Sequence, residues 1–108
     1  MTDVEGGRPA RRQEEPAPFF MLRLFIAGEE VASTLARENL LRVCERYISG
    51  RYSIEVIDIL KDFRAALENG VLMTPMLVIM NPQPPVGIVG DLSDTRKLLN
   101  AFRLPAED

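Results

Sequence analysis

The stretch 74–93, TPMLVIMNPQPPVGIVGDLS, decides the fold of this chain. Its first apolar run, 76–80, follows a Thr-Pro pair and has β-branched residues at its centre, which favour a strand. Three prolines then reverse the chain, and a second apolar run at 86–89 ends in Gly-Asp-Leu-Ser. So short a connection predicts an antiparallel pair of strands. Ser93 is predicted to cap a final helix, with Asp94 in its first turn.

The part of the chain before this stretch predicts a strand, a helix and a second strand. Residues 19–26 are apolar apart from Arg23, as is typical of a strand covered on both faces. Residues 53–60 predict a second buried strand. Between them, apolar residues recur at three- and four-residue spacing, which predicts a long amphipathic helix and hence two parallel strands. The stripe on this helix consists of Ala36, Leu40, Val43, Cys44, Tyr47 and Ile48.

A short helix is predicted directly after the second strand. Asp62 is its predicted N-cap and Gly70 its stop. Phe63, Ala66 and Leu67 are expected to face the interior. The predicted elements therefore follow the order β-α-β-α-β-β-α, which is an α/β fold.

The length and composition predict one small domain between two tails. Residues 1–18 mix Gly and Pro with charged residues and are predicted to form a disordered N-terminal tail, because they cannot bury enough apolar surface to offset the ordering entropy. Residues 19–104 form the predicted domain, and residues 105–108 a short C-terminal tail.

Charge and hydropathy exclude several classes of function. The formal net charge is −3 without a clustered run of Lys or Arg, which argues against a general nucleic-acid-binding surface. No apolar run approaches the ~20 residues that a membrane-spanning helix needs. The N-terminus lacks an apolar signal core, and a single cysteine fits a reducing compartment, so the sequence predicts a cytoplasmic protein.

The titratable residues do not form a pattern typical of an active site. Because the chain has no histidine, imidazole-based nucleophile activation and imidazole metal sites are excluded. Cys44 lies on the predicted apolar stripe and is expected to be a buried structural thiol. Asp58, Asp62, Asp91 and Asp94 could be taken as an acid/base or metal cluster, but positions at helix starts and strand ends explain them better. We therefore predict no catalytic, cofactor-binding or metal site.

The position of Pro75 resembles that of the proline before a central strand in thioredoxin-like folds, where this residue is cis. An X-Pro bond pays only ~0.5–1 kcal/mol for the cis form, so tertiary context can select it. We expect Thr74–Pro75 to be cis; the alternative is a trans proline that only starts a strand. The redox motif Cys-x-x-Cys after the first strand is replaced by Gly-Glu-Glu-Val at 28–31, which disfavours a thiol oxidoreductase.

With these motifs in view, the chain resembles the KaiB family of circadian-clock proteins from residue 21 to about residue 104. Gly-Asp-Leu-Ser at 90–93 is the most specific motif, and the spacing from Lys61 to Gly90 matches without a gap. The remaining anchors are Leu-Phe-Ile-Ala-Gly at 24–28, Glu-Val-Ile-Asp at 55–58, Leu-Lys at 60–61, Thr-Pro at 74–75, Pro82 and Pro84.

The resemblance implies a non-enzymatic, cofactor-free binding protein that docks on the ring-shaped ATPase KaiC and recruits or displaces KaiA-like or sensor-kinase proteins. It also implies fold switching between a thioredoxin-like, partner-binding state and a tetrameric ground state of order β-α-β-β-α-α-β. We predict the thioredoxin-like order for this chain. Residues 64–68 are strong helix formers and residues 76–80 favour a strand, so the other order would oppose both local preferences.

The resemblance also assigns candidate site residues. Lys61 matches a basic residue of the family's binding surface, and Arg23 and Asp58 are further partner-binding candidates. The positions that match residues tuning the fold switch are Pro75, Gly90 and Asp91.

Three departures from the family pattern are visible. Val86 and Gly87 stand where an Arg/Lys pair is usual, so a surface loses two positive charges. Residues 29–31 replace the Thr-Pro that usually enters the first helix, and Phe63 replaces a proline. Two other functions remain open on the same fold: a thiol enzyme, which the missing cysteine pair disfavours, and a competitor of KaiB-like sensor domains that precede some histidine kinases.

Overall fold

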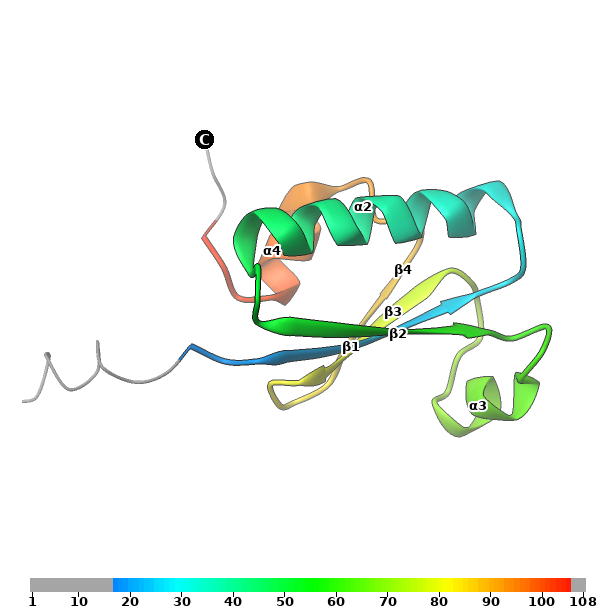
Figure 1. Ribbon diagram of the computed structural model, residues 1–108. Helices are drawn as coiled ribbons and strands as arrows, with labels where there is room; N and C mark the ends of the chain where they lie inside the picture. The colour runs from blue at the N-terminus through cyan, green and yellow to red at the C-terminus, as the bar shows by residue number, and fades with distance from the viewer. Residues whose placement is uncertain (1–16, 106–108) are drawn as a thin grey trace, which may run out of the picture.

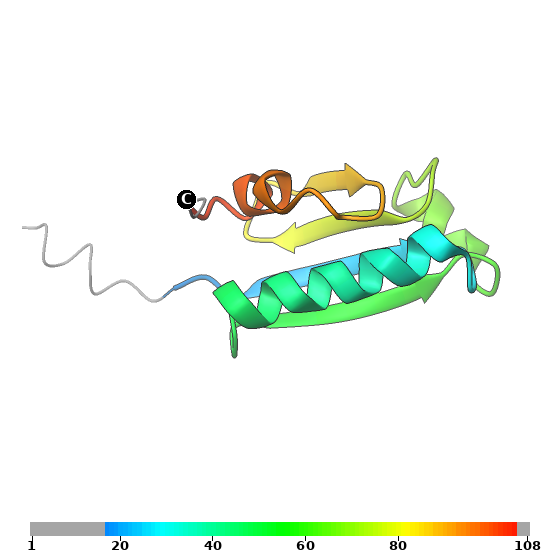
Figure 2. The same cartoon turned by 90° about the horizontal axis from the view of Figure 1, so that it is seen from above.

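A four-stranded sheet with helices on both faces forms the body of the protein in the computed structural model, which describes residues 17–105. Helices α2 and α4 cover one face of the sheet and α3 lies on the other side (Figure 1). Figure 2 shows α2 running along β1 and β2, with α4 beside β3 and β4. The elements are β1 (Phe20–Ile26), α2 (Val31–Tyr47), β2 (Tyr52–Asp58), α3 (Phe63–Glu68), β3 (Met76–Asn81), β4 (Val86–Val89) and α4 (Thr95–Ala101).

The predicted thioredoxin-like order β-α-β-α-β-β-α is confirmed. The strands lie side by side as β2-β1-β3-β4, with β1 parallel to β2, while β3 is antiparallel to both β1 and β4. Residues 63–68 are helical and residues 76–81 are a strand, which is the reverse of what the alternative order needs. The expected cis bond at Thr74–Pro75 is present, and the bonds preceding Pro82 and Pro84 are also cis.

The two faces of β1 have different surroundings, because successive side chains of a strand point to opposite faces. Phe20, Leu22, Leu24 and Ile26 belong to the main hydrophobic core, on the face that α2 and α4 cover. Arg23 lies between two of these residues and therefore points to the face on which α3 lies.

Helices α2 and α4 close the core with the apolar stripes that the sequence predicts. Leu40 and Cys44 of α2 are fully buried, and so are Leu98 and Leu99 of α4. Just after α4, the ring of Phe102 packs edge-on against the ring of Phe20 with 5.0 Å between centroids. This aromatic contact joins the start of β1 to the end of the last helix.

The prediction that residues 53–60 form a buried strand is wrong. β2 is an edge strand of the sheet, and most of its residues are exposed or half-buried. Its regular structure also ends at Asp58, so residues 59–61 form a turn and Leu60 is exposed. An edge strand has a neighbour on one side only, and α2 covers just one of its faces.

The orientation predicted for α3 is also wrong in part. Asp62 is confirmed as its N-cap, since the Ala65 N–H donates to Asp62 Oδ1 at 3.1 Å. Of the three residues expected to face the interior, only Ala66 is buried; Phe63 is 66% exposed and Leu67 68% exposed. The helix is six residues long and lies at the end of the sheet, so it has too little sheet beneath it to bury a full apolar stripe.

The N-cap of α4 is Asp94, not Ser93 as predicted. The Asp94 side chain accepts a hydrogen bond from the Lys97 N–H at 3.1 Å. The Ser93 N–H donates instead to Asp91 Oδ1 at 3.0 Å, which holds Ser93 in the turn before the helix begins.

The tail predicted at 1–18 lies mostly outside the described residues, as do residues 106–108 of the predicted C-terminal tail. Pro18 O accepts a hydrogen bond from the Arg51 guanidinium at 3.2 Å, next to the start of β1.

Two adjacent leucines of α2 test the position of the core. Leu40 is fully buried, whereas Leu41 is 51% exposed. We expect Leu40→Ala to lower the free energy of unfolding by about 2–5 kcal/mol, because it removes buried contacts and leaves a cavity. Leu41→Ala should change it by about 0.5 kcal/mol or less. Urea denaturation with equal m-values checks both, and similar losses in the two variants would contradict this core.

Candidate functional site

The position that a redox motif would occupy, between β1 and α2, holds a network of polar side-chain contacts. Ser33 is buried; its hydroxyl donates to Glu30 Oε1 at 2.9 Å and accepts from the Ala27 N–H at 3.1 Å. The Thr74 hydroxyl donates to the same carboxylate oxygen at 3.4 Å, beside Pro75. These side chains stabilise the start of α2 and include no thiol.

Cys44 is far from this position and buried within the core, as predicted. Burial, with a smaller contribution from the negative charge of Glu45, raises the pKa of the Cys44 thiol to about 12. The thiol therefore stays protonated at neutral pH and cannot act as a nucleophile, which requires the thiolate.

The turn after β2 presents Lys61 to solvent. Asp58 Oδ1 accepts hydrogen bonds from the N–H groups of Gly28 and Leu60, each at 3.0 Å, and its carbonyl accepts from the Lys61 and Asp62 N–H groups. Asp58, predicted as a partner-binding residue, thus joins the ends of β1 and β2 and shapes the turn. The Lys61 side chain is exposed and has no polar partner among residues 17–105.

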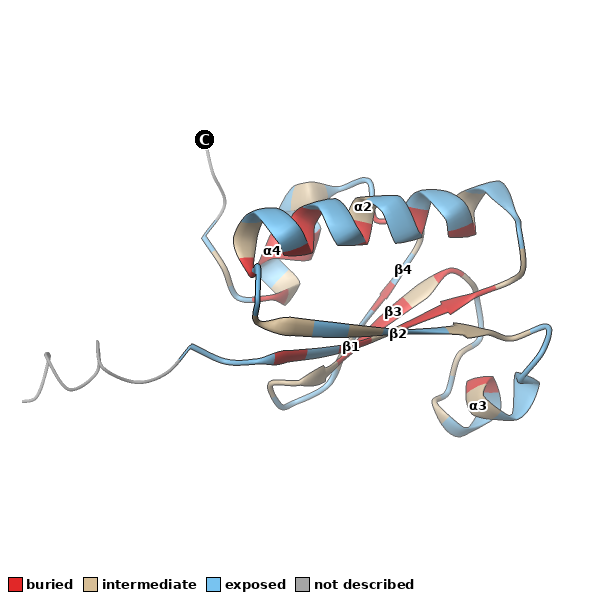
Figure 3. Ribbon diagram, in the orientation of Figure 1, coloured by how far each residue is buried: buried red, intermediate tan, exposed pale blue. Residues whose placement is uncertain are grey.

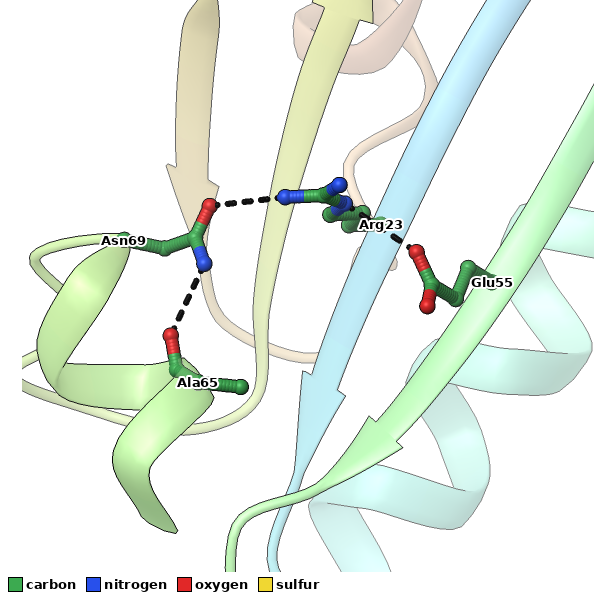
Figure 4. Close-up of polar contacts among 4 residues, drawn as sticks. All are labelled: Arg23, Glu55, Ala65 and Asn69. Atoms are coloured by element: carbon green, nitrogen blue, oxygen red, sulfur yellow. Dashed lines mark hydrogen bonds and ion pairs between the residues drawn. The ribbon is translucent and has the colours of Figure 1, made fainter. Parts of the chain in front are cut away.

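Arg23 connects three elements at the other end of α3 (Figure 4). Its Nε donates to Glu55 Oε1 of β2 at 3.1 Å, and its Nη1 donates to Asn69 Oδ1 at 3.1 Å. The Asn69 amide in turn donates to Ala65 O within α3 at 2.8 Å. Lys61 and Arg23 therefore lie at opposite ends of α3. Arg23 is hydrogen-bonded, whereas the Lys61 side chain has no polar partner within residues 17–105.

Large apolar side chains gather on α3 and on the loops that flank it. Phe63 and Leu67 are four residues apart, so they lie on the same side of the helix. Figure 3 shows that most of α3 and both of its connections are exposed or half-buried. We call this group the α3 surface: Leu60, Lys61, Phe63, Leu67, Leu72 and Met73, whose side chains are all exposed.

The apolar part of the α3 surface was not predicted from the sequence. Phe63 and Leu67 were expected in the interior, because an apolar stripe on a helix normally marks its buried side. The available signal for an exposed apolar surface was the pair Leu72 and Met73 before Thr-Pro. These two large apolar residues lie in a predicted loop, where no core is predicted to bury them.

The three fold-switch candidates lie close together near the ends of β3 and β4. The Gly90 N–H donates to Pro75 O at 2.9 Å, and Gly90 has a φ of 121°, which favours glycine. The carbonyl of Asp91 accepts from the Asn39 side chain of α2 at 2.9 Å. Hydrogen bonds from the hydroxyl and backbone N–H of Ser93 lower the pKa of the Asp91 carboxyl.

The two positions that lack the family's basic pair face opposite sides of the sheet. Val86 packs against the hydrophobic core, on the face of α2 and α4. Gly87 is exposed on the other face, where an added Cβ would meet the terminal methyl of Met76 at 2.7 Å. A basic side chain fits at Gly87 if the flexible end of Met76 moves, but at Val86 it would disturb the core.

Residues 17–105 contain no group of three or more Cys, Asp or Glu side chains placed to hold a metal ion. None of the helices in the same range is long and apolar enough to cross a bilayer.

A sequence model of the KaiB domain matches residues 23–104 of this chain. The chain belongs to the KaiB family. Among KaiB relatives, the circadian clock protein KaiB3 of Synechocystis is 38% identical over 79 residues, covering 73% of this chain and 78% of the relative. The circadian clock oscillator protein KaiB of Microcystis aeruginosa is 37% identical over 89 residues, covering 82% of this chain and 86% of the relative.

Solved structures show the fold that this KaiB-family chain shares. The N-terminal domain of SasA from Synechococcus elongatus has a TM-score of 0.67 at 18% identity and covers 88% of this chain and 93% of that domain. Mitochondrial thioredoxin 3 from Saccharomyces cerevisiae has a TM-score of 0.65 at 16% identity. The match covers 81% of this chain and 80% of the thioredoxin chain. At these identities the likeness extends to the thioredoxin-like fold alone.

The buried thiol predicts an inert cysteine in the native protein. With a pKa of about 12, Cys44 should react with a thiol reagent at pH 8 far more slowly than a surface cysteine, since its thiolate fraction is lower by about a thousandfold. A Cys44→Ala/Ser53→Cys variant, which keeps a single cysteine at an exposed position, is the matched control. Equal rates of DTNB labelling in the two native proteins would show that Cys44 is accessible.

The carboxyl of Asp91 predicts a pH dependence at the end of β4. Its pKa is lowered from the ordinary 3.8, so its stabilising contribution is complete above that value and is lost as the pH falls through the lower folded-state pKa. We expect an NMR titration of Asp91 to have its midpoint below 3.8. Ser93→Ala should move the midpoint upward, since the hydroxyl donor is gone; an unchanged midpoint would count against this hydrogen bond as the cause.

Proposed function

We propose that this KaiB-family chain is a non-enzymatic regulatory binding protein that docks on a KaiC-type ATPase through the α3 surface. The observation that carries the proposal is the concentration of exposed apolar side chains around α3, together with the unpartnered Lys61. Exposed apolar clusters with a charged rim are typical of protein-binding surfaces. The relatives are named as circadian clock proteins, which supports a partner of the same kind. The KaiC-type ATPase is the partner that the family resemblance implies.

The proposal assigns different tasks to the two kinds of residue in the α3 surface. Phe63 and Leu67 supply apolar area that the partner removes from water, which provides most of the affinity. Lys61 lies beside them on a turn and acts mainly on the association rate, as charges at the rim of an interface do. The positive charge available here is lower than is usual in the family, because Val86 and Gly87 replace the basic pair.

Fold switching of the C-terminal half is part of the same proposal. The tetrameric ground state would keep β1, α2 and β2 and exchange helix for strand beyond them. Two observations support this division. α3 buries only one side chain, and within residues 17–105 one side-chain hydrogen bond, from Asn39, joins the Gly90–Asp91 turn to α2. Pro75, Gly90 and Asp91 are the residues proposed to tune it.

A thiol-disulfide enzyme on this fold is the rival function, and the site disfavours it. The buried Cys44 has no second cysteine, and the carboxylate of Glu30 lies where the redox pair would be. We propose that the protein acts in the cytoplasm, a reducing compartment that its single cysteine fits. A further proposed role is competition with a SasA-like sensor domain for the same ATPase. The support for this role is that the two proteins share one fold.

A charge reversal at Lys61 tests the docking surface. We expect Lys61→Glu to weaken binding to a KaiC-type ATPase by about 1–2 kcal/mol, with slower association and a wild-type unfolding curve. Added salt should weaken the unmutated complex, because exposed charges are screened. Arg96→Glu, an equally exposed cation on α4 across the sheet, is the matched control and should bind normally.

Two results of this experiment would reject the proposed site. Undiminished binding of the Lys61→Glu variant would place the interface elsewhere, and an equal loss in the Arg96→Glu variant would indicate a general charge effect. Surface plasmon resonance at two ionic strengths separates the association rate from the dissociation rate.

A further inference from the structure

The ends of α3 are stabilised by residues of the helix itself. At the N-terminus Asp62 caps the Ala65 N–H. At the C-terminus the Val71 N–H donates to Ala66 O at 2.9 Å and the Gly70 N–H donates to Leu67 O at 3.2 Å, which together form a Schellman motif. Gly70 has the positive φ of 69° that this motif requires. These contacts shape the helix but do not attach it to the sheet.

Apolar burial attaches α3 to the sheet in part. Phe25 of β1 and Val78 of β3 are buried on the face to which Arg23 points, and Ala66 is the buried side chain of α3. A helix of six residues is far below the length at which a helix is stable alone in water. It therefore depends on tertiary contacts, yet only Ala66 is buried, and the small Ala side chain removes little apolar surface from water. The larger Phe63 and Leu67 side chains point into solvent.

The polar contacts of Arg23 add a second attachment to this small buried patch. Figure 4 shows its guanidinium between Glu55 and Asn69, with Asn69 also bound to Ala65 O inside α3. One side chain thus joins β2, β1 and the C-terminal end of α3. Because a guanidinium is planar and carries five N–H donors, it can bind Glu55 through one nitrogen and Asn69 through another at fixed geometry.

We propose that the Arg23–Asn69 hydrogen bond is a latch that holds α3 on the open face of the sheet and so keeps the α3 surface in its docking arrangement. The claim about the docking arrangement rests on the proposed function, whereas the claim that the hydrogen bond holds α3 on the sheet does not. Arg23 is then a positioning residue for the docking surface rather than a contact with the partner, and Asn69 becomes a site residue that the sequence analysis did not select.

Amide hydrogen exchange tests the latch without any partner. The Val71 N–H, which is bonded to Ala66 O, reports whether the end of α3 is formed. In Arg23→Met and in Asn69→Ala we expect it to exchange about tenfold faster than in wild type, the factor for losing about 1.4 kcal/mol from a hydrogen bond to a charged group. Amides in the β1–β3 ladder should keep their wild-type rates.

Arg42 provides a matched control for removal of an arginine–asparagine contact. Its guanidinium donates to Asn39 Oδ1 at 2.8 Å on the exposed side of α2, so Arg42→Met deletes the same chemistry away from α3. We expect Val71 to exchange at the wild-type rate in this variant. Asn69 is half-buried at a helix end, so Asn69→Ala supplies the measurement even where Arg23→Met fails to fold.

The double variant Arg23→Met/Asn69→Ala separates the latch from local effects of Asn69 on its own helix. If the two residues act through their shared hydrogen bond, the acceleration at Val71 will be smaller than the product of the two single accelerations. An unchanged rate in Arg23→Met, accelerations that multiply in the double variant, or equal acceleration in the β1–β3 ladder would each overturn the proposal.

Binding to a KaiC-type ATPase distinguishes positioning from direct contact. Asn69→Ala changes no charge, so a latch predicts that it lowers affinity by about the same factor as Arg23→Met, on the order of threefold to tenfold. Loss of affinity in Arg23→Met alone would make Arg23 a contact and overturn the positioning role. If the wild-type protein does not bind the ATPase while Val71 responds as expected, the proposed function fails and the latch stands.

Discussion

The burial of one face of β1 is the constraint on which the rest of the structure depends. β1 lies between β2 and β3 in the sheet, and every second side chain from Phe20 to Ile26 enters the core beneath α2 and α4. Because a shift of one residue would expose all of these side chains together, the register of β1 is strongly specified. The registers of its two neighbouring strands follow from it, as does the placement of Arg23 on the opposite face.

The two faces of the sheet consequently differ in how firmly they are covered. Two helices with buried apolar stripes pack on the core face, whereas the opposite face has only the short α3 at one end. Phe25, Val78 and Ala66 are buried on this face, but Phe63 and Leu67 of α3 remain exposed. The hydrogen bond from Arg23 to Asn69 adds to this small apolar patch in anchoring the helix. Exposed apolar clusters of this kind are typical of surfaces that another protein buries.

Much of the fold could be predicted because the relevant signals are local. The order of elements, the Asp62 cap, the buried Cys44 and the cis bond at Pro75 are all present as expected. The wrong predictions include the N-cap residue of α4, for which adjacent side chains compete, and the burial of β2, which depends on its position in the sheet. Asp94 displaces Ser93 as N-cap, since Ser93 is already bonded to Asp91, and β2 is exposed because the order of strands puts it at the edge.

The sequence by itself determined the family, the alternation of strands and helices, and the absence of the residues that thiol or imidazole chemistry needs, because periodicity, capping and composition act within a few residues. Tertiary structure alone decided which apolar side chains remain exposed, such as Phe63 and Leu67. It also decided that Arg23 is hydrogen-bonded while Lys61 has no polar partner within residues 17–105. Arg23 reaches Asn69 across 46 positions of sequence, and Phe63 is exposed because the sheet ends beneath α3. Such features depend on how the elements pack in space, which no local pattern encodes.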